Sequence, residues 1–136
     1  VLVLVAGGLV LATRGDDGPA QLASTTLRPV SGVDLGLATA SATLQRDGSN
    51  LQLHLQMDDL PSPARGTYYE LWLLSKAGRP VPLATMKEPA RTVDTDVSIP
   101  PGVDTDRYDV VDVSVQVDGE GPEHSGNSVL RGTLRA

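Results

Sequence analysis

The chain has 136 residues, with 17 acidic against 11 basic side chains and a formal net charge of −6. This excess of negative charge disfavours contact with phosphate backbones, so we do not expect nucleic-acid binding. No cysteine is present, which excludes disulfides, thiolate zinc sites and thiol nucleophiles from this chain. The length suits one ordinary domain.

The chain begins with twelve uncharged residues, mostly Val, Leu, Ala and Gly. As a helix this stretch would cover roughly 18 Å, against about 30 Å of membrane hydrocarbon. We therefore expect residues 1–14 to be the C-terminal part of a transmembrane helix. The remnant of a signal peptide and a buried N-terminal strand are the alternatives. The acidic flank at Asp16 and Asp17 places the rest of the chain on the extracytoplasmic side of the cell membrane.

Residues 15–25 are rich in Gly, Asp, Ala, Ser and Thr, and this composition predicts a flexible juxtamembrane linker. From residue 26 to residue 136, short runs of alternating apolar and polar residues are separated by Gly and Pro turns. We expect strands at 39–45, 51–57, 67–74, 81–86, 97–99, 108–117 and 128–134. About seven short strands predict an all-β fold, an antiparallel β-sandwich of the Ig-like or Greek-key type.

Four segments carry a family resemblance. Tyr-Glu-Leu-Trp-Leu at 69–73 is similar to the Y-E-[VL]-W-[LV] strand of the anti-sigma-K factor (RskA) C-terminal domain family. Residues 78–83 resemble its G-x-P-V-x-x-G turn, and residues 113–119 its V-S-[VL]-E-P-x-G-G stretch. The ending H-S-G-x-S-V-L-R-G-x-L is matched at 124–134. Gln116 and Val117 depart from the usual Glu-Pro, and Leu83 or Ala84 stands where glycine is expected.

The resemblance implies the extracytoplasmic regulatory domain of a single-pass anti-sigma factor, which controls sigma-factor release through regulated proteolysis. The implied partners are site-1-type and intramembrane proteases. The sigma factor itself would be held by an N-terminal cytoplasmic module that this chain does not contain. The alternative is a membrane-anchored ligand-binding or adhesion module unrelated to transcription. Gly7 and Gly8, which weaken a helix by about 1 kcal/mol each relative to alanine, mark the candidate intramembrane cleavage region.

Six residues form a candidate structural or partner-contact motif: Tyr69, Glu70, Trp72, His124, Ser125 and Arg131. We expect Trp72 to be the main core anchor of the sandwich, with ligand stacking as the alternative. Glu70 is expected either to face solvent or to pair with Arg131 on a neighbouring strand.

No catalytic residue, metal site or cofactor is expected. His124 and Ser125 are adjacent in one loop and lack the third group of a catalytic set. A turn is preferred instead, in which Ser125 and Asn127 hydrogen-bond to local backbone and Gly126 takes a positive φ. The Asp-Thr-Asp pairs at 94–96 and 104–106 lack the spacing of a calcium loop, and we expect solvated carboxylates.

Overall fold

The computed structural model describes residues 18–87 and 91–136, and these residues form an all-β domain. The eight strands are β1 (Ala20–Pro29), β2 (Thr39–Asp47), β3 (Asn50–Asp58), β4 (Thr67–Leu74), β5 (Val81–Met86), β6 (Thr92–Ser98), β7 (Val110–Val117) and β8 (Ser128–Thr133). The described part of the chain contains no helix able to cross a membrane. The expected transmembrane segment 1–14, with Gly7 and Gly8, lies outside the described residues.

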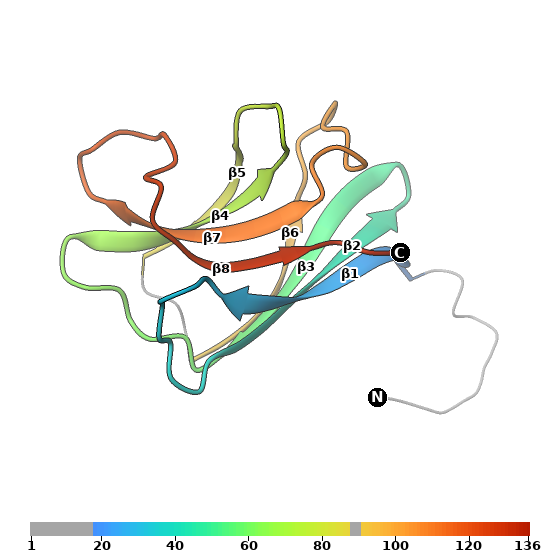
Figure 1. Ribbon diagram of the computed structural model, residues 1–136. Helices are drawn as coiled ribbons and strands as arrows, with labels where there is room; N and C mark the ends of the chain where they lie inside the picture. The colour runs from blue at the N-terminus through green and yellow to red at the C-terminus, as the bar shows by residue number, and fades with distance from the viewer. Residues whose placement is uncertain (1–17, 88–90) are drawn as a thin grey trace.

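All strands belong to one antiparallel sheet with the order β5-β4-β7-β8-β1-β2-β3-β6. The sheet curls until its edge strands β5 and β6 approach each other, giving a nearly closed, barrel-like shape (Figure 1). The predicted all-β antiparallel class is thus confirmed. The two separate sheets of a sandwich are not found, because β1 pairs with β2 along most of its length and with β8 at Arg28 and Pro29.

Strand β1 also corrects the predicted domain boundary, because residues 20–25 belong to the sheet and not to a linker. Residues 20–25 share the Ala-, Ser- and Thr-containing composition of the preceding segment, and four of the six are exposed. Backbone pairing holds this segment instead: it follows β2 with a register shift between Gln21 and Ala23. Ser24 also exchanges two backbone hydrogen bonds with Arg135.

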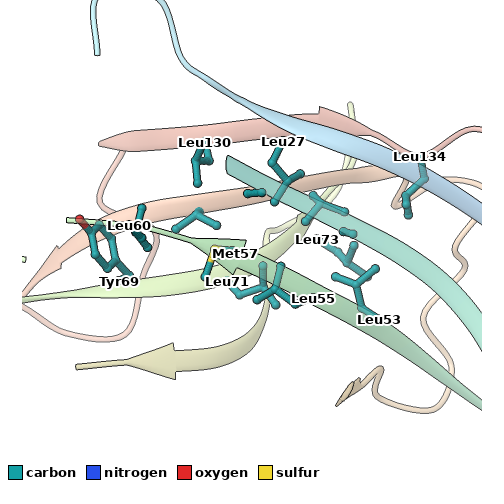
Figure 2. Close-up of a cluster of buried hydrophobic side chains, with 14 of the residues drawn as sticks. Leu27, Leu53, Leu55, Met57, Leu60, Tyr69, Leu71, Leu73, Leu130 and Leu134 are labelled. Carbon is teal, nitrogen blue, oxygen red and sulfur yellow. The ribbon is translucent and has the colours of Figure 1, made fainter. Parts of the chain in front are cut away.

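The apolar core lies inside the curl, where inward-facing residues from opposite sides of the sheet meet (Figure 2). Alternation explains which residues point inward: Leu71 and Leu73 of β4 and Val111 and Val113 of β7 have no exposed surface. They pack with buried residues of β1, β2, β3 and β8, among them Leu27, Leu44, Leu53, Leu55, Met57 and Leu130.

Candidate functional site

The outer face of β7 carries three polar side chains, on the side of the strand opposite its inward-facing valines. Asp112, Ser114 and Gln116 alternate with the core valines, yet all three are buried. The β7–β8 loop, residues 118–127, provides hydrogen-bond partners for this face. Buried polar groups are costly unless they are paired, and no buried side-chain nitrogen or oxygen in the described residues lacks a partner.

Asp112 is the centre of this buried network and has no exposed surface. Its Oδ2 atom accepts hydrogen bonds from His124 Nε2 at 2.8 Å and from Ser128 Oγ at 2.9 Å. Its Oδ1 atom accepts a bond from Arg131 Nε at 2.8 Å. The Arg131 side chain is about half exposed, and its guanidinium compensates the charge of the buried carboxylate from the solvent side of the network.

The β7–β8 loop fixes the orientation of the His124 ring. The backbone N–H of Gly126 donates to His124 Nδ1 at 2.9 Å, so Nε2 carries the proton that is donated to Asp112. Ser125 Oγ donates to Val115 O at 2.6 Å and accepts from Asn127 N at 3.1 Å. Gly126 has a φ of 85°. The bond between Asn127 N and Ser125 Oγ and the positive φ of Gly126 agree with the turn predicted for residues 125–127, whereas His124 binds Asp112 of β7.

Trp72 lies on the same outer face and not in the interior cluster. Its burial, at 2% exposed, was expected, but its place as the core anchor was wrong, because its neighbours Leu71 and Leu73 occupy the inward positions of β4. The indole ring lies against His124 with centroids 4.9 Å apart. Its Nε1 donates to Ser114 Oγ at 2.8 Å, and Ser114 Oγ donates to Gln116 Oε1. Trp72 therefore anchors the β7–β8 loop to the sheet.

A pocket of about 720 Å³ opens beside this aromatic pair. It is lined by Trp72, Arg79, Pro80, Pro82, Pro122, Glu123 and His124. The volume falls within the range of about 300–1,000 Å³ that is typical of small-molecule sites. The turn before β5 supplies one part of the lining and the β7–β8 loop another, so the pocket joins segments that the sequence places about 40 residues apart.

Glu70 and Arg131 do not form the strand-to-strand pair that was one of the two expected arrangements. Glu70 lies opposite Thr85 of β5 and Ser114 of β7, whereas Arg131 lies opposite Asp112. Thr85 Oγ1 donates to Glu70 Oε1 at 2.7 Å. Partial burial raises the pKa of Glu70, and the hydrogen bond from Thr85 lowers it in part.

Tyr69 points into the core, with 3% of its surface exposed. Its hydroxyl donates to the backbone oxygen of Pro61 at 2.6 Å, and burial raises the pKa of the phenol. Tyr69 therefore holds the loop before β4 against the core through this hydrogen bond, and it takes no part in the network around Asp112.

The two Asp-Thr-Asp pairs have different partners, one on a neighbouring strand and one within its own turn. Asp94 and Asp96 of β6 flank His54 of β3, with Asp94 Oδ1 3.0 Å from Nε2 and Asp96 Oδ1 2.6 Å from Nδ1. Asp104 Oδ1 accepts the backbone N–H of Asp106 at 3.0 Å, as in a local turn. Within the described ranges, no group of three His, Asp or Glu residues is placed to hold a metal ion.

Asp112 is the site residue that sequence reasoning missed. Its signal was visible, because one carboxylate interrupts the apolar run Val110, Val111, Asp112, Val113. An acidic residue in such a run requires a partner. The histidine, serine and arginine of the tail motif supply the partners.

We expect the Glu70→Gln variant to differ from the parent chain in the pH dependence of its stability. The raised pKa means that the folded state binds the Glu70 proton more tightly than the unfolded state does. The ordinary pKa of a glutamate is 4.5. As the pH rises above 4.5, the contribution of Glu70 to the free energy of unfolding therefore falls, and the glutamine variant does not show this fall. Urea melts at several pH values measure it. Thr85→Val should steepen the fall, and parallel pH profiles for the parent and Glu70→Gln would contradict the assignment.

The family model described as anti-sigma-K factor rskA, C-terminal, matches residues 1–128 of the chain. The matched range includes every residue that lines the pocket, and also Asp112, His124 and Ser128. No curated protein and no solved structure matches the chain.

Proposed function

Because the chain belongs to the family of anti-sigma-K factor RskA C-terminal domains, we propose that it is the extracytoplasmic regulatory domain of a single-pass anti-sigma factor. The family implies a sigma factor as the partner, which a cytoplasmic module would hold. The uncharged residues 1–12 and the acidic flank after them support a position outside the membrane.

The observation that carries the regulatory role is the place of β1 in the sheet. The first strand of the domain lies between β8 and β2: its backbone pairs with β2 over residues 20–27, with β8 at Arg28 and Pro29, and with Arg135 at Ser24. A protease requires an accessible, extended segment of backbone. The folded sheet thus withholds residues 20–29 from a site-1-type protease, and opening of the sheet releases them.

Removal of the outer domain would then leave the membrane segment for an intramembrane protease. Gly7 and Gly8 are the proposed region for that second cleavage, because adjacent glycines lower the cost of unwinding a helix by about 1 kcal/mol each. Release of the cytoplasmic module would free the sigma factor for transcription.

The test uses the full-length protein in its own cells, with a reporter for the sigma-dependent promoter. Asp112→Asn removes the centre of the buried network and destabilises the sheet, so we expect reporter activity to rise and the intact protein to decrease. Asp118→Asn is the matched control, because this carboxylate is about half exposed and directly follows the same strand. An unchanged reporter together with a destabilised domain would contradict regulated proteolysis and favour the ligand-binding or adhesion alternative.

The same cells test the location of the domain. The chain has no cysteine, and Leu37 is 87% exposed, so Leu37→Cys introduces one accessible thiol into this domain. A maleimide that does not cross membranes should label it in intact cells. Labelling that occurs only after lysis would place the domain in the cytoplasm and contradict the proposal.

A further inference from the structure

The pocket beside Trp72 is lined by groups that the fold holds in place before any ligand arrives. Pro80, Pro82 and Pro122 restrict the backbone on both sides of it. The rings of Trp72 and His124 are held by hydrogen bonds to Ser114, Asp112 and Gly126 N–H. Such preorganisation lowers the entropic cost of binding.

The two rings offer only apolar surface to a ligand. The indole N–H of Trp72 donates to Ser114, and both nitrogens of His124 are bonded within the domain. With the three prolines they form a lining that suits aliphatic or aromatic side chains. Hydrogen bonding by these rings to a ligand would require the buried network to break.

Two opposite charges line the same pocket. Arg79 and Glu123 are both exposed, and neither makes an ion pair with any residue that the structure describes. Arg79 lies at the turn before β5 and Glu123 in the β7–β8 loop, so the charges come from different segments of the lining. The pocket therefore presents one cation and one anion around an apolar surface.

We propose that this pocket binds a short apolar peptide of two or three residues with free ends. Its carboxylate would pair with Arg79 and its ammonium group with Glu123, while its side chains contact the prolines and the two rings. Arg79 and Glu123 form no ion pair with each other, so both charges are available to the two ends of a peptide. The pocket volume of about 720 Å³ is that of a small-molecule site, which limits the peptide to two or three residues. The pocket belongs to the folded domain wherever the chain is located in the cell.

The chain contains its own reporter for this test, because Trp72 is the only tryptophan. Both its fluorescence and its single indole N–H signal in an NMR spectrum report on the pocket. With the 136-residue chain in detergent micelles, titration with leucyl-leucine should give a saturable change in both signals. N-acetyl-leucyl-leucine amide, which has the same side chains and no charged ends, should bind at least about tenfold more weakly.

Two charge variants complete the test. Arg79→Gln and Glu123→Gln should each weaken leucyl-leucine at least about fivefold and leave the circular dichroism spectrum unchanged, since both side chains are exposed. Arg65→Gln and Glu120→Gln are matched controls, exposed residues outside the pocket lining, and should bind like the parent chain. Equal binding of the blocked peptide, no saturable signal, or a response to methyl glucoside in place of the peptide would each overturn the proposal.

Discussion

Replacing Asp112 with asparagine is expected to lower the free energy of unfolding by at least about 3 kcal/mol, because the buried carboxylate accepts three hydrogen bonds and each bond to a charged group contributes about 1.5–3 kcal/mol. The carboxylate has no exposed surface and accepts hydrogen bonds from His124, Ser128 and Arg131. Asparagine keeps the size of the side chain but has one acceptor oxygen and adds an NH₂ group among donors. Urea melts followed by circular dichroism measure the change.

Two further variants separate this network from general sensitivity of the strand. Asp118→Asn removes an exposed ion pair in which Asp118 Oδ1 lies 3.7 Å from Lys87 Nζ. It should lower the free energy of unfolding by less than about 1 kcal/mol. Arg131→Met should be destabilising alone, because it leaves the Asp112 charge without its cation, and much less so in combination with Asp112→Asn. Additive effects of Asp112→Asn and Arg131→Met would show that the two residues do not act as a pair.

Trp72→Ala is expected to cost about 3–5 kcal/mol, although the ring lies outside the interior cluster. The substitution removes a side chain that is 2% exposed, its contact with His124 and the hydrogen bond to Ser114 Oγ. The β7–β8 loop loses its anchor, and the outer face of β7 is opened to water. Circular dichroism is the appropriate probe, since the variant has no tryptophan fluorescence.

Trp72→Phe serves as the partner variant, because it keeps most of the apolar contact and removes the indole N–H. It should cost less than Trp72→Ala and leave Ser114 with one partner fewer. A loss below about 1 kcal/mol for Trp72→Ala would mean that the loop does not depend on the ring.

The strands were predictable from the sequence wherever side chains alternate between core and solvent. The ranges expected at 67–74 and 81–86 agree with β4 and β5, and those at 39–45 and 51–57 lie within β2 and β3. The first strand was missed because its pairing depends on backbone hydrogen bonds and hardly on apolar side chains. Strand β6 was expected only at 97–99, because exposed Asp94, Thr95 and Asp96 occupy its middle.

The candidate site was predictable in its residues and not in its arrangement. Trp72, His124, Ser125 and Arg131 were singled out; His124 and Arg131 bind Asp112, and Trp72 lies against His124 beside the pocket. Periodicity assigns Asp112 to the outer face of β7 but does not reveal that the β7–β8 loop covers that face. The partner of Arg131 depends on strand order, in which β8 adjoins β7 and not β4, and a single sequence does not specify that order.

The pairing of β1 with β8 also bears on when the domain can fold during synthesis. Arg28 lies opposite Arg131, so the first strand made meets a strand that leaves the ribosome about 100 residues later. Strands β1, β2 and β3 can assemble early as neighbouring hairpins, whereas the second side of β1 stays open until β8 has emerged. Contacts between such distant segments slow folding and prolong the time in which unpaired edges are exposed. A nascent chain halted before β8 should therefore remain open to proteases at β1, even when its first three strands have formed.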